Sequence, residues 1–185
     1  MTVTIDGTTG ETTPATKYTG STSGTITLQA AAVAGTNTVT VAAQTGTLNV
    51  AGPAFHATAA GSQTLTSNTA TKILFATEDF DTNNNFASST FTPTVAGYYQ
   101  ITVRVQVQVG TTANYAIAYI YKNGVVWSQN QGAPVTSTSM SALVTDIVYC
   151  NGTTDYIDGY GNAVGTGTLT VTASSFFSGC LLRGA

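Results

Sequence analysis

Tyr99-Gln-Ile-Thr-Val-Arg-Val-Gln-Val-Gln-Val109 is the most regular stretch of this sequence. Apolar and polar residues alternate along its whole length, with Tyr99, Ile101 and the following valines on one side and Arg104 among the polar residues on the other. Because successive side chains of a β-strand point to opposite faces, this pattern predicts a long strand with one face in a core. We expect the polar face to lie in water or at an interface.

Further strand signals lie on both sides of this stretch. Asn123-Gly124 and Asn151-Gly152 each follow a predicted strand, and an Asn-Gly pair favours a tight turn because both residues tolerate a positive φ. The expected strands are 72–76, 89–92, 115–121, 125–127, 140–149, 154–157, 167–173 and 176–182. About eight to ten short strands separated by turns are typical of an all-β protein, an antiparallel β-sandwich or jelly roll.

The segment 115–121 differs from the first strand because neither of its faces is strongly polar. Its tyrosines, Tyr115, Tyr119 and Tyr121, fall on one face, and two alanines and Ile120 fall on the other. We therefore expect both faces to be covered, by the core or by a neighbouring subunit.

The composition excludes several classes of function. Only 7% of the residues are charged, against roughly 25% in an ordinary globular domain, while 42% are apolar. A net charge of −3 leaves too little positive charge for a nucleic-acid partner. No apolar run approaches the roughly 20 residues needed for membrane insertion. The first six residues lack the basic start of a secretory signal, so we expect synthesis in a cytoplasm.

The first 51 residues differ in texture from residues 52–185, being rich in Thr, Gly and Ala with Tyr18 as the only aromatic residue. Three short segments with strand-like alternation echo one another at 24–28, 37–41 and 46–50. Strands with such small side chains bury little surface within one chain. We expect residues 1–51 to form a β anchor or shaft that is intertwined with copies of itself.

Residues 53–183 resemble the C1q-like domain. The matching pieces, in order, are Pro53-Ala-Phe-His-Ala57, Lys72-Ile-Leu-Phe75, Phe86 to Ile101, Ile120-Tyr-Lys-Asn-Gly124 and Phe176 to Leu182. Where the family usually has Leu-x-x-Gly-Asp, this chain has Tyr149-Cys-Asn-Gly-Thr-Thr-Asp155. The resemblance implies a jelly-roll head that assembles as a homotrimer. The residues expected in its core or trimer interface are Phe55, Tyr99, Ile101, Tyr115, Tyr119, Tyr121, Phe176 and Leu181.

The N-terminal segments 1–10 and 32–47 are similar to segments of bacteriophage tail-fibre and other virion proteins. Together, the two resemblances imply a non-enzymatic virion protein whose N-terminal part attaches to another virion protein and whose head points outward, towards a glycan or receptor of the host. Two alternatives stay open: a cellular C1q-like recognition module of the lectin or spore-surface type, and a tail protein that degrades polysaccharide.

Two groups of carboxylates are candidate metal ligands. Glu78, Asp79 and Asp81 precede three asparagines and offer the oxygen donors that Ca²⁺ takes, but the frame of an EF-hand is absent. Asp155 and Asp158 could meet a cation or their symmetry mates near a trimer axis. We favour an acidic solvated loop for the first group and loop carboxylates without a metal for the second, and we expect no cofactor.

No constellation of catalytic residues is recognisable. His56 is the only histidine and lies in a predicted strand without a nucleophile motif, and no pair of carboxylates has a spacing typical of a glycosidase. Tyr156, Tyr160 and Trp127 are candidates for binding a glycan or a receptor, with packing as the favoured alternative. Cys150 and Cys180 are interpreted as two buried apolar residues, with a disulfide as the alternative.

Overall fold

The computed structural model describes residues 15–19, 25–29, 52–61, 63–133 and 138–185. The chain divides into two units, Met1–Thr45 and Gly46–Ala185. In the first unit, strands β1 (Ala15–Thr19) and β2 (Thr25–Gln29) pair antiparallel. The strand β2 lies close to the prediction at 24–28, whereas the predicted segments 37–41 and 46–50 lie outside the described residues.

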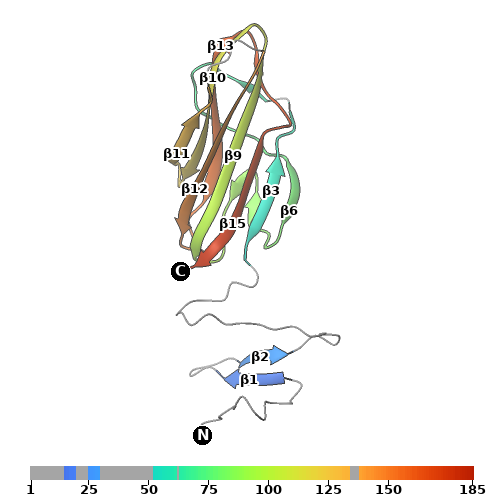
Figure 1. Cartoon of the computed structure of the whole chain (residues 1–185), viewed down its shortest axis with the longest axis vertical. Helices are drawn as coiled ribbons and strands as arrows, with labels where there is room; N and C mark the ends of the chain where they lie inside the picture. Colours follow the sequence, from blue (N-terminus) through green and yellow to red (C-terminus); the bar gives the residue numbers. More distant parts are fainter. Residues whose placement is uncertain (1–14, 20–24, 30–51, 62, 134–137) are drawn as a thin grey trace. The chain divides into compact units, whose positions relative to one another are not determined.

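The second unit is an antiparallel β-sandwich of two sheets (Figure 1). The β9 sheet contains β6 (Thr77–Asp81), β3 (Ala54–Thr58), β15 (Phe176–Gly184), β14 (Leu169–Val171), β4 (Thr64–Leu65), β9 (Gly97–Val109) and β12 (Ser139–Cys150). The β10 sheet contains β11 (Val125–Gln131), β10 (Thr112–Lys122), β13 (Ile157–Thr166), β8 (Thr90–Phe91), β7 (Phe86–Ala87) and β5 (Thr71–Lys72). The described residues contain no helix, and the predicted all-β jelly-roll sandwich is confirmed.

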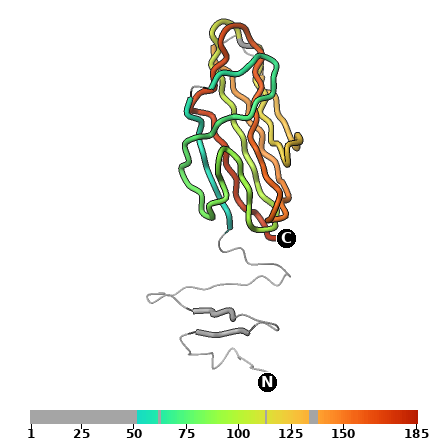
Figure 2. The backbone as a smooth tube through the Cα atoms, turned by 180° about the vertical axis from the view of Figure 1, so that it is seen from behind, coloured from blue at the N-terminus to red at the C-terminus, as the bar shows by residue number. Residues whose placement is uncertain are grey.

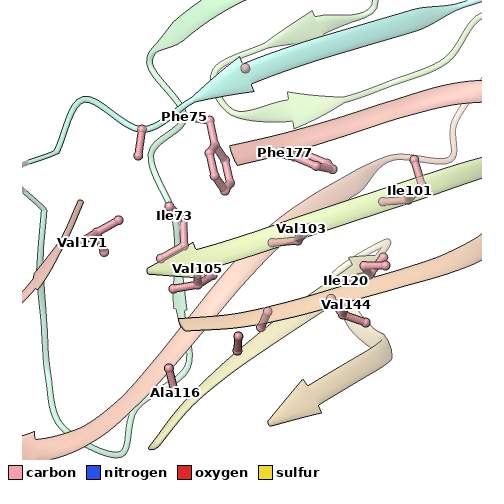
Figure 3. Packing of buried hydrophobic residues seen from close by; sticks show 14 of the residues in the cluster. Ile73, Phe75, Ile101, Val103, Val105, Ala116, Ile120, Val144, Val171 and Phe177 are labelled. Carbon is pink, nitrogen blue, oxygen red and sulfur yellow. The ribbon is translucent and has the colours of Figure 1, made fainter. Parts of the chain in front are cut away.

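The long alternating stretch is the central strand β9, which pairs with β12 along its whole length on one side and with β15 and β14 on the other. The side chains of Tyr99, Ile101, Val103, Val105 and Val107 are fully buried. They fill the space between the sheets together with aromatic residues such as Phe75 and Phe177 (Figure 3). The prediction of one core face is therefore confirmed for the whole strand.

The strand β10 buries the opposite face from the one that its bulky residues suggest. Ala116, Ala118 and Ile120 are fully buried against the core, whereas Tyr115 and Tyr121 point outward and are half-buried. Small residues face inward here because β13, the neighbour of β10, also lies very close to β9. A Cβ atom added at Gly161 of β13 would lie 2.8 Å from Val105 Cγ1.

The same close approach explains why the strand β13 is missing from the sequence prediction. At Gly159, an added Cβ would lie 2.8 Å from the ring of Phe75 and 3.3 Å from Val103. Glycine is ordinarily depleted in strands, so a strand with several glycines gives a weak sequence signal. Here the missing side chains let the two sheets approach each other.

Two of the predicted strands are wrong in their bounds. Segment 72–76 leaves the sheet after Ile73, whose N–H still donates to Gly159 O of β13 at 3.0 Å. The next two donors bind side chains: Leu74 N donates to Gln63 Oε1 and Phe75 N to Ser89 Oγ, each at 2.9 Å. Segment 154–157 is mostly a loop, because Asn151 Oδ1 accepts hydrogen bonds from the backbone of residues 153 to 155.

The Asn123-Gly124 hairpin is confirmed. Both residues have positive φ, 52° and 79°, and the turn joins β10 to β11 with Lys122 opposite Val125. The hairpin places β11 at the edge of the β10 sheet, along one side of the sandwich (Figure 2). The chain enters and leaves the sandwich at the same end, where Leu181 N donates to Pro53 O at 2.9 Å.

Candidate functional site

An apolar patch covers the outer side of β12 and the start of β9. It consists of Tyr98, Leu143, Ile147 and Tyr149, with exposed fractions of 44%, 45%, 52% and 39%, and we call it the β12 face. The register places Tyr149 opposite Tyr98, and their ring centroids lie 5.4 Å apart. Beside the patch, a hydrogen bond of 2.9 Å joins the hydroxyl groups of Thr102 and Thr145. Large apolar side chains that gather on one face typically mark an interface.

On the same outer side of this sheet, towards its other edge, His56 of β3 lies between two aromatic rings and is bound to a carboxylate. Its Nδ1 lies 2.6 Å from Asp79 Oδ2, and its ring stacks on Phe176 at 5.4 Å between centroids. Ser178 lies opposite His56 across the strand pair, but no hydrogen bond joins the two in the described chain. The pair therefore lacks the nucleophile contact that a triad requires.

The edge strand β11 carries a second group of exposed apolar side chains. Val125, Val126 and Trp127 have exposed fractions of 69%, 44% and 48%. The ammonium group of Lys122 lies 5.7 Å from the ring centroid of Trp127 and 5.6 Å from that of Tyr149. The strand β11 lies beside β12, where Asn130 Nδ2 donates to Leu143 O at 2.8 Å. Exposed apolar side chains of this kind invite packing with another chain.

The outer side of the β10 sheet is lined by tyrosines, and we call Tyr119, Tyr121 and Tyr160 the tyrosine face. The rings of Tyr121 and Tyr160 stack with centroids 4.0 Å apart and an angle of 22° between planes, and Tyr119 meets Tyr121 edge-on at 6.0 Å. Burial raises the pKa of Tyr121 and Tyr160 above the usual 10.0. Their hydroxyl groups are therefore neutral at physiological pH.

Asp155 and Asp158, the second candidate metal group, are both buried and paired with lysines. Lys122 Nζ lies 3.0 Å from Asp155 Oδ2, and Lys72 Nζ lies 2.7 Å from Asp158 Oδ1. The interpretation of both as loop residues is wrong for Asp158, which belongs to β13. A hydrogen bond from Asn123 Nδ2, together with the ion pair to Lys122, lowers the pKa of Asp155 despite its burial.

The first candidate metal group is not a loop, which corrects the prediction. Glu78, Asp79 and Asp81 lie in β6, an edge strand that pairs with β3, and Asp79 is bound to His56. Asp81 accepts hydrogen bonds from the backbone N–H groups of Asn83 and Phe86. Within the described ranges, no three His, Cys, Asp or Glu side chains gather where they could hold a metal ion.

Neither cysteine forms a disulfide. The prediction that both are buried is wrong for Cys180, which is exposed. Cys150 is fully buried at the end of β12, and burial raises its pKa to about 11. Cys180 is exposed on the outer side of β15. It lies opposite Gln100 of the neighbouring strand β9, so both side chains point to the same, outer side of the sheet.

The remaining residues named from the sequence are distributed over several places. Phe55, Tyr99 and Ile101 lie in the core, and Leu181 packs against it. The three glycan candidates do not form one contact group: Tyr160 stacks on Tyr121, Trp127 lies under Lys122, and Tyr156 lies beside the Asn123-Gly124 turn, where its N–H donates to Asn123 Oδ1.

Sequence reasoning missed the β12 face. Its signal was present, because segment 140–149 carries apolar residues at both parities: Val144 and Val148 face the core while Leu143 and Ile147 face outward. It also missed the contact of His56 with Asp79, which joins two strands 23 residues apart and has no local pattern. No helix of the described residues is long and apolar enough to cross a membrane.

Comparison of the sequence with protein-family models and with curated proteins gives no match. Comparison of the structure does. The globular domain of the zebrafish complement 1qA protein is matched over its full length and over 73% of this chain, at 15% identity and a TM-score of 0.55. Murine APRIL is matched over 98% of its length and 70% of this chain, at 11% identity and a TM-score of 0.53. The PRD1 vertex protein P5 is matched over 97% of its length and 71% of this chain, at 15% identity and a TM-score of 0.54. At these identities the likeness establishes the fold, a C1q/TNF-like jelly roll.

Proposed function

We propose that this chain is a non-enzymatic structural protein of a bacteriophage virion whose jelly-roll unit assembles as a homotrimer. In this proposal residues 1–51 attach to another virion protein, and the sandwich is a head that contacts a glycan or receptor on the host surface. Three copies of a weak binding site then act together, so that avidity replaces high affinity at any single site.

The observation that carries the homotrimer is the β12 face. Leu143 and Ile147 are about half exposed, although they stand beside a fully buried row on the same strand. Apolar and aromatic side chains beside an arginine are typical of protein interfaces, and here Arg104 lies opposite Leu143, with the paired Thr102 and Thr145 next to them. A second copy of the chain is the partner that is always present at matching concentration.

The position of β11 supports a ring. Val125, Val126 and Trp127 lie on the edge strand beside β12, where Asn130 Nδ2 of β11 donates to Leu143 O at 2.8 Å, so they extend the β12 face. An apolar surface that covers two strands at one edge of the sandwich can contact a different surface of the next copy. A contact between two different surfaces is heterologous, and repeating it closes a ring when the rotation permits. The C1q-like resemblance in the sequence implies that this ring has three members.

The virion setting rests on two supports of different kinds. The N-terminal segments resemble those of phage fibre proteins, and one solved structure with the same fold is the vertex protein P5 of PRD1. The fold therefore occurs on a virus particle.

Light scattering on the full chain tests the assembly. The proposal expects three times the mass of one chain, and a monomeric mass would overturn the homotrimer. Immunogold labelling of purified phage particles tests the setting: label at a fixed position on the particle is expected, and particles that never carry the protein would overturn the virion function.

A further inference from the structure

The tyrosine face lies on the sheet opposite the β12 face, and the proposed assembly does not use it. It carries an aromatic pair that is only partly covered: Tyr121 and Tyr160 are half-buried and stack on each other at 4.0 Å. The pair comes from neighbouring strands, β10 and β13, so its position is fixed by the ladder between them. A rigid, half-exposed aromatic surface loses little entropy when a ligand binds to it.

The polar groups of this face are available for a ligand. Among the described residues, the hydroxyl groups of Tyr121 and Tyr160 make no hydrogen bond, whereas Tyr119 is buried with an exposed fraction of 8%. A neutral phenol both donates and accepts, and the raised pKa of Tyr121 and Tyr160 keeps their phenols neutral well above physiological pH. The exposed side chain of Gln129 lies opposite Tyr119 on β11 and adds an amide at the border of the face.

A buried acceptor without a partner lies on the same side of β13. Asn162 is two residues from Tyr160, so strand alternation places both side chains on the outer side of the sheet. Asn162 has an exposed fraction of 6%, and its Oδ1 has no hydrogen-bond donor within the protein. A buried polar atom of this kind is rare and costs stability. A donor from a ligand would satisfy it after a change of the Asn162 rotamer.

The charges beside the tyrosine face are already neutralised. Asp158 Oδ1 accepts from Thr90 Oγ1 and pairs with Lys72 Nζ, each at 2.7 Å. Tyr160 lies directly opposite Lys72 across the strand pair, so the ion pair forms one border of the face. A surface that combines aromatic rings, hydroxyl groups and amides with balanced charge fits a neutral ligand with many hydroxyl groups better than an anion or a cation.

We propose that the tyrosine face binds a neutral saccharide chain. The C–H groups of a sugar ring pack on the exposed parts of the Tyr121 and Tyr160 rings, and its hydroxyl groups bond to the tyrosine hydroxyl groups and to the amides of Gln129 and Asn162. Tyrosine suits this contact because it joins an apolar ring to a polar tip.

This inference rests on the proposed function for its setting and deepens it, because it names the ligand class of the head. A second copy of this chain is a different occupant of the same face, and it is an outcome of the test. The two proposals can fail separately, because saccharide binding at one site does not require three copies.

The test is titration calorimetry and saturation-transfer NMR of the full chain with neutral oligosaccharides: maltohexaose, cellohexaose, chitohexaose, mannohexaose and a galactan fragment. We expect millimolar or tighter binding of at least one of them, with transfer to its ring protons. Tyr160→Ala should weaken binding at least tenfold, and Tyr160→Phe, which keeps the ring, by about fivefold for one lost hydrogen bond. Phe80→Ala is the matched control: Phe80 is half exposed on β6, at the far edge of the other sheet, and its variant should bind as the wild type does.

Asn162→Leu separates a binding group from a structural one. The substitution removes a buried acceptor that has no partner, so we expect the free energy of unfolding to stay the same or to rise while saccharide affinity falls. Loss of stability with unchanged affinity would show that Asn162 serves the fold alone and would contradict this part of the site.

Failure of every oligosaccharide to bind would overturn the inference, as would binding that Phe80→Ala abolishes and Tyr160→Ala does not. Light scattering on Tyr160→Ala tests whether a second copy of the chain occupies the tyrosine face. A loss of the oligomer would show that the face is a subunit contact and would overturn the inference. A trimer that binds no saccharide leaves the proposed assembly intact, whereas a monomer that binds one overturns the assembly alone.

Discussion

The two outer faces of the sandwich are built on strands of similar length, but their side chains differ in kind. The β12 face places the aliphatic side chains of Leu143 and Ile147, which offer almost nothing but apolar area, beside the rings of Tyr98 and Tyr149. The tyrosine face consists of tyrosine rings without aliphatic neighbours of that size, beside an unpaired amide oxygen. Burial of aliphatic surface in a permanent interface lowers the free energy of the assembly. Aromatic rings with polar tips suit a reversible contact in water. One fold can therefore present an assembly surface on one sheet and a ligand surface on the other.

The largest expected effect comes from the core that both faces share. Phe177 packs edge-on against Phe55 at 4.8 Å and contacts Phe75 at 5.5 Å. Phe177→Ala should lower the free energy of unfolding by about 3–5 kcal/mol, because it leaves a cavity between the sheets. Guanidinium denaturation monitored by far-UV circular dichroism measures this loss. A loss confined to one sheet in hydrogen exchange would contradict a single shared core.

A charge on the β12 face should separate assembly from folding. Ile147→Asp places a carboxylate at the centre of the proposed subunit contact, so we expect light scattering to give the mass of one chain. Folding should persist, because the side chain is half exposed in a single chain. Leu74→Asp is the control: Leu74 is equally exposed but lies away from this face, and its variant should keep the wild-type mass. The same mass for Ile147→Asp and Leu74→Asp would contradict the assignment of the β12 face as the subunit contact.

The loop that joins β12 to β13, and hence the two sheets, should make stability depend on acid. Asp155 binds Asn123 and Lys122, so Asp155→Ala should cost about 2 kcal/mol of unfolding free energy through lost charged hydrogen bonds. The pKa of Asp155 is lowered by folding. Its contribution is therefore complete above the unfolded pKa and is lost as the pH falls through the folded pKa.

Denaturation of Asp155→Asn from about pH 5 to about pH 2 measures this linkage. The profile of the variant should be flatter than that of the wild type. A wild-type slope in Asp155→Asn would show that folding does not lower the pKa of this carboxyl and would contradict the account.

The smallest effect is a difference in thiol reactivity. Cys180 is exposed in a single chain, on the outer side of the sheet that carries the β12 face, whereas Cys150 is buried with a pKa of about 11. A maleimide should modify Cys180 faster in Ile147→Asp than in the wild type and should leave Cys150 unmodified in both, as mass spectrometry of peptides can show. Equal rates at Cys180 would place it outside the subunit contact.

The parts of the fold that the sequence predicts are those with a local period or a local turn. The alternation around Tyr99 and the Asn123-Gly124 hairpin need no information from distant residues. Strand β13 has no such period. Its glycines are required because Phe75 and Val105, which lie on distant segments, leave no room for a Cβ atom. The tyrosine face could not be predicted for the same reason. The tyrosines of β10 are visible in the sequence, but the stacking of Tyr121 on Tyr160 depends on the register between β10 and β13.

The β12 face is a different case, because a local sequence pattern indicates it and the sequence analysis did not interpret that pattern. Segment 140–149 has apolar residues at both parities, which distinguishes it from the strictly alternating β9. A strand of this kind must be covered on both sides. The resemblance to C1q-like domains led to a trimer without saying which side chains the trimer covers.

Hydroxyl-radical footprinting of the native full-length protein tests the difference between the two faces most directly, because tyrosines report on both. The account predicts that Tyr98 and Tyr149 are protected from oxidation in the wild type and become reactive in Ile147→Asp, while Tyr121 and Tyr160 react equally in both. Protection of Tyr121 and Tyr160 together with free reaction of Tyr98 and Tyr149 in the wild type would contradict it.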